Sequence, residues 1–183
     1  MSSPADYYDL SRIRPEVLAA LDKINAMGPA FAARAKAVDD EASFPTENYK
    51  DLADAGFLGL SIPQEFGGWG FSMGEYAMVG AEIAKYCGAT ALTFNMHNSS
   101  MAWSRFMFDM PNLTAEEKAE FAPLRARQFT RAMKERAIFS QPISEGGQNW
   151  TSKPNQTQAR AFEGGWKING FKKFASLAGY CDY

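Results

Sequence analysis

The sequence predicts a mainly α-helical fold over residues 1–135, followed by the beginning of antiparallel β-structure over residues 136–183. Two observations indicate this order. Up to Glu135-Arg136, apolar residues recur at the spacing of amphipathic helices. Beyond that point, short β-branched or aromatic runs alternate with turns rich in Gly, Asn and Pro. The change in character predicts a domain boundary after residue 135.

The composition is that of an ordinary globular protein and argues against several functions. Of the 183 residues, 46% are hydrophobic and 22% are charged, which is enough to bury a sizeable core. A net charge of -2 offers no basic surface, so we expect no nucleic-acid partner. His97 is the only histidine and Cys87 and Cys181 are the only cysteines, so a metal site or a Ser-His-Asp triad has little to be built from.

We expect a cytoplasmic protein with no membrane partner. No stretch approaches the roughly 18 uninterrupted apolar residues of a membrane span. The start of the sequence, Met1 to Asp6, lacks the basic and apolar regions of a signal peptide.

Two helices are predicted before residue 60. The first begins at Pro15, a favourable first-turn residue, and we expect it to break at Gly28-Pro29 and resume through Val38. The second begins at Phe44-Pro45 and ends at Gly56, a glycine C-cap.

The glycine-rich loop Gln64–Phe71 contains three aromatic residues. Such a loop can cradle a phosphate group, but a dinucleotide-binding loop follows a clear strand and this one does not. We therefore favour a purely structural loop.

A pair of helices is predicted next. Ser72 and Glu75 have the spacing of a capping box, and the helix they start runs to Tyr86. The segment Thr90–Phe108 is apolar and aromatic all round, which predicts a central helix buried on most sides. His97 lies within it, and a lone histidine there is more often a hydrogen-bonded core residue than a catalyst.

A further helix is predicted from a second capping box, Thr114 with Glu117, to about Phe121. Pro123 then begins a basic segment, for which we favour a solvated helix face over an anion site. Its cations are Arg125, Arg127, Arg131 and Lys134.

The stretch from Ala137 to Ser176 looks most like a site. Ala137–Phe139 reads as a buried strand that ends at Ser140 and a proline. Further on, Asn169-Gly170 predicts a hairpin turn that joins a strand over residues 166–168 to one over residues 174–176. Two strand ends, each carrying a serine, would then face one ligand.

A series of motifs runs along the chain in a fixed order. They are Phe44-Pro45, Leu52-Ala53-Asp54-Ala55-Gly56-Phe57-Leu58-Gly59-Leu60, Pro63-Gln64-Glu65-Phe66-Gly67-Gly68-Trp69-Gly70, Glu82-Ile83-Ala84-Lys85, Thr90-Ala91-Leu92 and His97-Asn98-Ser99. In sequence and order they resemble the N-terminal helical domain of the acyl-CoA dehydrogenase family. Phe139-Ser140-Gln141-Pro142 is similar to the family's Leu-Thr-Glu-Pro strand end. Asn169-Gly170-Phe171-Lys172-Lys173-Phe174-Ala175-Ser176 is similar to its Asn-Gly-x-Lys-x-Trp-Ile-Thr segment.

The resemblance implies that residues 136–183 are the first part of a middle β-domain, an antiparallel barrel or sandwich that receives FAD. Phe139 and Ser140 would then contact the pyrimidine edge of the flavin, through backbone and hydroxyl groups. Phe174 would pack on the isoalloxazine ring, with Ala175 beside it, and Ser176 would bond near the reactive nitrogen.

Gly147 and Gln148 stand where the resemblance implies contact with the acyl thioester. Here the sequence departs from the family, since Glu145-Gly146-Gly147-Gln148 replaces Gly-Ser-Asp. Serine also replaces threonine twice, Gln141 replaces glutamate and Phe174 replaces tryptophan. These changes keep the hydroxyls and an aromatic face, so they affect thioester specificity more than flavin binding.

The activity implied is α,β-dehydrogenation of an acyl-CoA to the enoyl-CoA, in which a base removes the α-proton and the flavin accepts the β-hydride. The base would lie C-terminal to Tyr183, so we expect the 183-residue chain alone to be inactive. An electron acceptor such as an electron-transfer flavoprotein and a homotetrameric full-length form are also implied.

Two alternatives stay open. One is a flavin-dependent monooxygenase on the same scaffold, in which His97 could gain a role. The other is an inactive truncated fragment that serves at most as a helical interaction module, with unpaired strand edges and exposed apolar surface.

Overall fold

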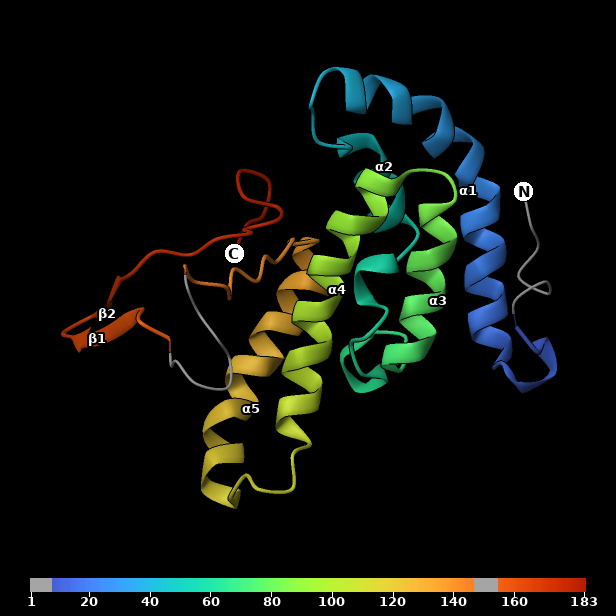
Figure 1. The fold of residues 1–183 in the computed structure, drawn as a ribbon. Helices are drawn as coiled ribbons and strands as arrows, with labels where there is room; N and C mark the ends of the chain where they lie inside the picture. Colours follow the sequence, from blue (N-terminus) through green and yellow to red (C-terminus); the bar gives the residue numbers. More distant parts are fainter. Residues whose placement is uncertain (1–7, 147–154) are drawn as a thin grey trace.

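The computed structural model describes residues 8–146 and 155–183 and consists mainly of helices, with one hairpin in its C-terminal part (Figure 1). The long helices are α1 (Pro15–Asp40), α2 (Thr46–Asp54), α3 (Met73–Ala84), α4 (Gly88–Phe108) and α5 (Ala115–Thr130). Short 3-10 turns lie at Leu10–Arg12 (η2), Phe57–Gly59 (η3) and Gln64–Phe66 (η4), and a π-helical turn, η5 (Arg131–Glu135), continues α5. Strands β1 (Gln158–Phe162) and β2 (Gly165–Asn169) pair antiparallel. The predicted order, mainly α and then antiparallel β, is confirmed.

The expected break in the first helix is wrong, because α1 runs unbroken through Gly28 and Pro29. A proline inside a helix removes one backbone hydrogen bond and bends the helix, and Figure 1 shows α1 changing direction along its length. Gly28 lies against the ring of Tyr86, leaving no room for a Cβ atom, and the Tyr86 hydroxyl donates to Asn25 Oδ1 at 2.7 Å. This contact holds α1 against the end of α3.

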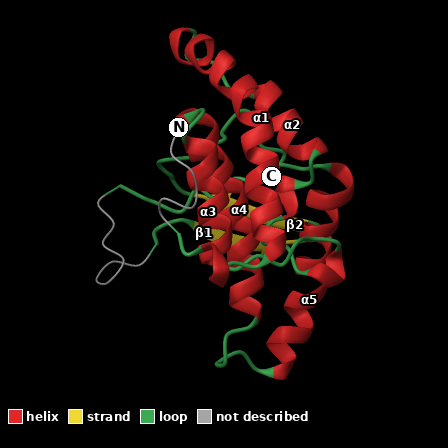
Figure 2. Cartoon of the chain, turned by 90° about the vertical axis from the view of Figure 1, so that its right-hand side faces the viewer, coloured by secondary structure: helices red, strands yellow, loops and turns green. Residues whose placement is uncertain are grey.

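The main core lies where α1, α3 and α4 pack together, and helices make up most of the molecule (Figure 2). Ile24, Ile83 and Phe94 are fully buried there. Burial of such side chains stabilises a fold by roughly 1.5–3 kcal/mol each, so these three helices account for much of the stability of the described residues.

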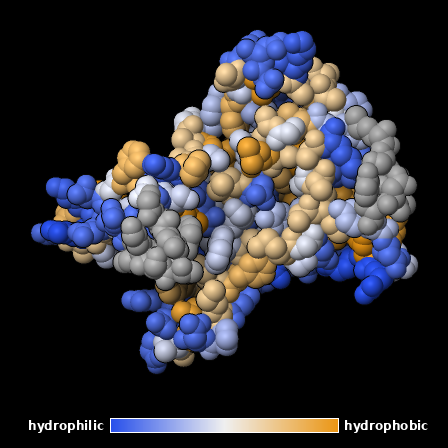
Figure 3. Space-filling view, viewed as in Figure 1, coloured by the Kyte–Doolittle hydropathy of each residue, from blue (hydrophilic) through white to orange (hydrophobic). Residues whose placement is uncertain are grey.

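The prediction that the central helix is buried on most sides is confirmed, with one exposed stripe along α4. Its buried residues include Phe94 and Met101, but Leu92 is 66% exposed, Trp103 45% and Met107 48%. The space-filling view shows apolar side chains at the surface in the region of α4 (Figure 3). Helices α1, α2, α3 and α5 contact α4 on its other sides.

The glycine-rich loop is structural, as favoured from the sequence. Its backbone N–H groups donate to carbonyls of the preceding turn: Trp69 to Gly59, Gly70 to Ile62, and Phe71 to Leu60, at 2.8–3.0 Å. With these donors engaged inside the chain, they are not directed at a phosphate group.

Both capping boxes are confirmed, at Ser72 and at Thr114. The helix that begins after Thr114 is longer than expected, since α5 continues through Pro123 to Thr130. Its C-terminal half is held by tertiary packing, in which the buried ring of Phe129 lies edge-on to Phe66, with ring centroids 5.2 Å apart. Packing of this kind outweighs the one backbone hydrogen bond that the proline removes.

The predicted hairpin turn is misplaced, although the strand over residues 166–168 is present in β2. The turn is Glu163-Gly164, where Gly164 has φ +89°, and the partner of β2 is β1. Ala137–Phe139 does not form a regular strand. Its pairing is short: Asp182 N–H donates to Ile138 O and Ser140 N–H donates to Tyr183 O, both at 2.8 Å.

None of the described helices is long and apolar enough to cross a membrane. Within the same residues, no three His, Cys, Asp or Glu side chains gather as metal ligands would.

Candidate functional site

The structure brings together the two serine-bearing segments that the sequence singles out. Ser140 Oγ donates a hydrogen bond to the backbone carbonyl of Ser176 at 2.7 Å. Both residues are half-buried. The segment that follows α5 and the segment that follows β2 therefore meet at these two residues, as expected if they share a ligand.

His97 fixes the first of these segments to the helical core. The Phe139 N–H donates to His97 Nδ1 at 3.1 Å, and His97 Nε2 lies 3.0 Å from Leu58 O. Because Nδ1 accepts, the proton must be on Nε2, which donates to Leu58. Complete burial lowers the pKa of His97 to about 4, so the ring is neutral at pH 7. The interpretation of His97 as a hydrogen-bonded core residue is confirmed.

Aromatic packing adds a second anchor for Phe139. Its side chain is only 9% exposed and stacks on the ring of Tyr183, with centroids 5.1 Å apart. The guanidinium of Arg131 lies 4.4 Å from the centroid of the Tyr183 ring. Phe139 is therefore a packed residue whose ring is largely hidden from a ligand.

Phe174 is placed very differently. Its side chain is 81% exposed, and its backbone has φ +56°, in the left-handed region that non-glycine residues seldom adopt. Ala175 beside it is exposed, whereas Leu177 is 4% exposed and joins the main core. Leu177 anchors the loop, and the loop presents the Phe174 ring outward.

Only some of the polar groups at this site are free to hydrogen-bond to a ligand. The N–H groups of Phe139 and Ser140 already donate to His97 and Tyr183. The Ser176 hydroxyl makes no hydrogen bond to any residue that the structure describes. A ligand at this site would thus meet the Ser176 hydroxyl, lone pairs on Ser140 Oγ and the ring of Phe174.

The two predicted substrate-binding residues, Gly147 and Gln148, lie outside the described residues, and their role stays a prediction. Just before them, Glu145 accepts hydrogen bonds from the Lys172 ammonium at 2.6 Å and from the backbone N–H groups of Gln156 and Thr157. The hydrogen bond from Lys172, followed by those from Thr157 and Gln156, lowers the pKa of Glu145 to about 2.

Sequence reasoning missed this carboxylate as an organising group. Glu145 joins the start of β1 to the segment that leads to Ser176, and the Lys173 N–H donates to Ser144 O at 2.8 Å beside it. The available signal was the departure from the family pattern at Glu145-Gly146, together with a lysine pair that follows a strand.

A further link joins the site to α4. Ser99 Oγ donates to the side-chain oxygen of Gln141 at 3.3 Å. His97, two residues earlier in α4, makes the other contact. Helix α4 therefore contacts the 139–141 segment at two points, so the helical core sets the position of this segment.

Comparisons with known proteins match this fold and this order of elements. A family model, "Acyl-CoA dehydrogenase, N-terminal domain", matches residues 25–123. Benzylmalonyl-CoA dehydrogenase from Aromatoleum aromaticum is 26% identical over 153 residues, covering 84% of this chain and 38% of the relative. The human mitochondrial short-chain specific acyl-CoA dehydrogenase is 28% identical over 141 residues, covering 77% and 32%.

Solved structures share the fold as well. FMN-bound TdsC from a Paenibacillus species superimposes with a TM-score of 0.68 at 25% identity, covering 90% of this chain and 38% of that one. A nitrososynthase from Micromonospora carbonacea superimposes with a TM-score of 0.73 at 23% identity, covering 92% and 40%. The chain spans two fifths or less of the length of each of these relatives. The family match extends over more than half of the chain, and the chain belongs to the acyl-CoA dehydrogenase family.

Proposed function

We propose that this chain is the N-terminal portion of a flavin-dependent oxidoreductase that dehydrogenates an acyl-CoA thioester to the enoyl-CoA. Residues 1–135 would be its helical domain and residues 136–183 the first part of the flavin-binding β-domain. The observation that carries the proposal is the hydrogen bond between Ser140 and Ser176. It joins two segments that resemble the family's flavin-binding motifs, in a chain whose helices match the family model.

The side chains at this junction fit a flavin in part. Phe174 offers an exposed aromatic face, and Ser176 offers a hydroxyl that makes no hydrogen bond to the described residues. The N–H groups of Phe139 and Ser140 are engaged within the chain, so their contribution to a flavin would be limited to the Ser140 hydroxyl and to backbone carbonyls. When bound, the flavin supplies the electron sink that accepts a hydride from the substrate β-carbon.

The role of this chain would be orientation. Phe174 would stack on the flavin ring, Ser176 would hydrogen-bond to it, and α4 would hold the 139–141 segment through His97 and Ser99. The base that removes the α-proton lies outside this chain in the proposal, C-terminal to Tyr183, so the 183 residues alone would bind and orient without turnover.

The homologues named as acyl-CoA dehydrogenases support a thioester substrate. Dehydrogenation leaves a reduced flavin, which must pass its electrons onward, so we include an acceptor such as an electron-transfer flavoprotein in the proposal. We also propose a cytoplasmic, homotetrameric full-length form.

The test uses the gene product extended beyond Tyr183, loaded with FAD and mixed without oxygen with straight-chain and aromatic acyl-CoA thioesters. We expect loss of the visible flavin absorption and an enoyl-CoA product detected by mass spectrometry. Ser176→Ala should slow flavin reduction, and Ser43→Ala, at an exposed serine of the helical part, is the matched control. Equal flavin content and equal reduction rates in the two variants would refute the cofactor site.

A second candidate, a flavin-dependent monooxygenase, is supported by a specific likeness. TdsC, which is 25% identical to this chain, is a dibenzothiophene monooxygenase. The role that this alternative could give to His97 finds no support, because both ring nitrogens are bonded inside the core. Oxygen consumption by the reduced protein with an oxygenated product, and no enoyl-CoA, would favour this candidate over the dehydrogenase.

A further inference from the structure

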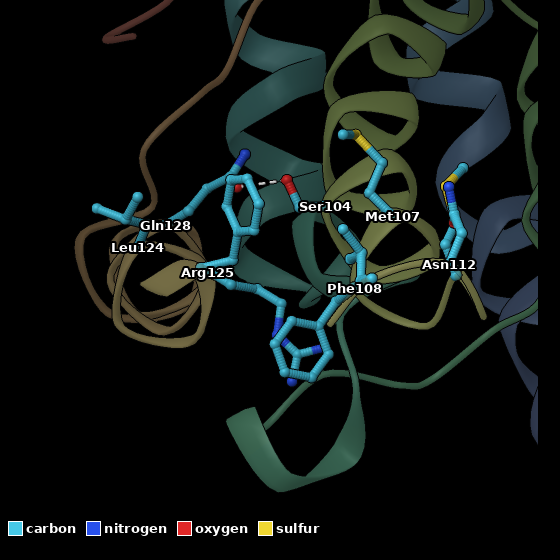
Figure 4. A pocket seen from close by; sticks show the side chains of 10 residues that line it. Ser104, Met107, Phe108, Asn112, Leu124, Arg125 and Gln128 are labelled. Carbon is cyan, nitrogen blue, oxygen red and sulfur yellow. Dashed lines mark hydrogen bonds between the residues drawn. The ribbon is translucent and has the colours of Figure 1, made fainter. Parts of the chain in front are cut away.

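An apolar pocket lies between the C-terminal end of α4, the loop after it and α5 (Figure 4). Its volume is about 250 Å³, below the roughly 300–1,000 Å³ of pockets for drug-sized ligands, so it suits a small molecule. Its wall is formed largely by Met107, Phe108, Leu113, Phe121 and Leu124. None of the residues predicted to contact the flavin, all of which the structure describes, lines it.

Arg125 closes one side of this pocket, which corrects the expectation of a solvated position. Its side chain is only 13% exposed. The guanidinium lies against the Phe108 ring (Figure 4). It is 3.8 Å from the centroid of that ring and 5.4 Å from that of Phe66. Aromatic rings from three different elements, with Phe129 of α5 itself as the third, cover the cation.

The charge of Arg125 is poorly compensated within the described residues. Its buried Nε has no hydrogen-bond partner there. The Glu65 carboxylate, itself 65% exposed, is the one carboxylate in reach, and it lies 4.0 Å from Nη2, too far for a hydrogen bond. Cation–π contacts offset part of the cost of burying the guanidinium, but a buried N–H donor without an acceptor favours the arrival of an anion.

Ser104, Asn112 and Gln128 are the other polar residues that line the pocket. Ser104 Oγ donates to the Gln128 side-chain oxygen at 2.5 Å, drawn as a dashed line in Figure 4. The remaining wall is apolar, with Phe121 44% and Leu124 51% exposed at the surface. A molecule that complements this site needs one acidic group for Arg125 and a short apolar body for the wall.

We propose that the pocket between α4 and α5 is a binding site for a small amphipathic carboxylate, with its acidic group on Arg125 and its hydrocarbon part against Met107, Phe121 and Leu124. Arginine suits this role because its planar group matches a carboxylate with paired N–H donors. The pocket shares no residue with the flavin contacts of the proposed function, so either proposal can fail without the other.

The test is isothermal titration of the purified chain with octanoate, with 1-octanol as the probe that has the same hydrocarbon and no charge. We expect saturable binding of octanoate and binding of 1-octanol weaker by roughly tenfold or more. Arg125→Gln should weaken octanoate binding by a similar factor. Arg127→Gln, which removes an exposed arginine of the same helix, should leave it unchanged.

A second variant guards against misfolding at the packed Arg125. Leu124→Glu changes a half-exposed position at the pocket wall and adds a like charge close to the carboxylate, so it should also weaken octanoate binding while thermal unfolding stays near that of the parent chain. Absence of octanoate binding, equal binding of octanol, or unchanged affinity in both Arg125→Gln and Leu124→Glu would overturn the proposal.

Discussion

The helical part of the chain, Pro15–Glu135, and the C-terminal part after it are held together by different forces. Phe31, Phe57 and Phe94 are completely buried in the helical part. In the C-terminal part, nearly every residue of β1 and β2 is exposed, and Trp166 and Phe174 are 67% and 81% exposed. The helices therefore form a core of their own, whereas the C-terminal part depends on a few anchors and polar contacts.

The difference indicates where a ligand or further protein would be needed. Aromatic rings that stay exposed to water contribute little to the stability of the fold. Large apolar groups at a protein surface commonly mark a binding site. The anchors that the C-terminal part does have, Phe139 and Leu177, lie on either side of the proposed flavin site and reach back to the helices. The helical part thus provides the support and the C-terminal part the contact surface.

The largest effect is expected when a phenylalanine is replaced by alanine in the helical part, compared with the same replacement in the C-terminal part. Phe94→Ala should lower the free energy of unfolding by about 3–5 kcal/mol, because it leaves a cavity in the main core. Phe162→Ala, at a ring 61% exposed on β1, should change it by less than about 0.5 kcal/mol. Urea denaturation of the 183-residue variants measures both, and similar losses would mean that the two regions share one core.

The next prediction concerns His97, the polar link between the regions. Its pKa is about 4 in the folded chain and 6.5 in its unfolded reference, so the unfolded chain binds more protons between these pH values. Stability is then greatest above pH 6.5 and falls as the pH drops toward 4, by on the order of 3 kcal/mol for this group.

The comparison that isolates this effect is His97→Gln, which has no titrating side chain. Urea denaturation between pH 5 and 7 should show a clear pH slope for the parent chain and a much shallower one for the variant. The chain has no other histidine, so equal slopes would contradict the buried neutral imidazole.

A smaller and more local effect is expected at Glu145. Glu145→Gln removes the charge that Lys172 and two backbone N–H groups bind. Hydrogen exchange of the Gln156 and Thr157 amides should become faster, with the exchange of α4 unchanged, and Glu163→Gln at the exposed turn serves as control.

The contribution of Glu145 to stability should also depend on pH in a known direction. Because the folded pKa of Glu145 is lowered to about 2 from 4.5, its contribution is present above pH 4.5 and lost as the pH falls toward 2. If the Gln156 amide exchanges its hydrogen equally slowly in Glu145→Gln and in the parent chain, the carboxylate does not order this segment.

How much the sequence could predict differs between local and tertiary features. The capping boxes at Ser72 and Thr114 were predictable because each is a hydrogen-bond pattern within four residues. The continuous α1 was not, because the contact of Gly28 with Tyr86 brings together residues far apart in the sequence. Packing of this kind overrides the local breaking tendency of Gly-Pro.

The same reasoning applies to the candidate sites. The approach of Ser140 to Ser176 was predicted from two strand ends that each carry a serine. The hairpin turn was predicted at Asn169-Gly170, but the strands pair around Glu163-Gly164 instead. Arg125 looked solvated because helical periodicity cannot reveal rings that other elements supply.

The most direct test of the central claim, that the exposed C-terminal surface is part of a flavin site, is a titration of FAD with the purified chain, followed by flavin fluorescence anisotropy. We expect saturable binding that Phe174→Ala weakens by about two- to tenfold, the range set by one aromatic stacking contact. Phe162→Ala, at an exposed phenylalanine of β1, should bind FAD as the parent chain does. Equal FAD affinity of Phe174→Ala and the parent chain, or no binding by either, would contradict the account.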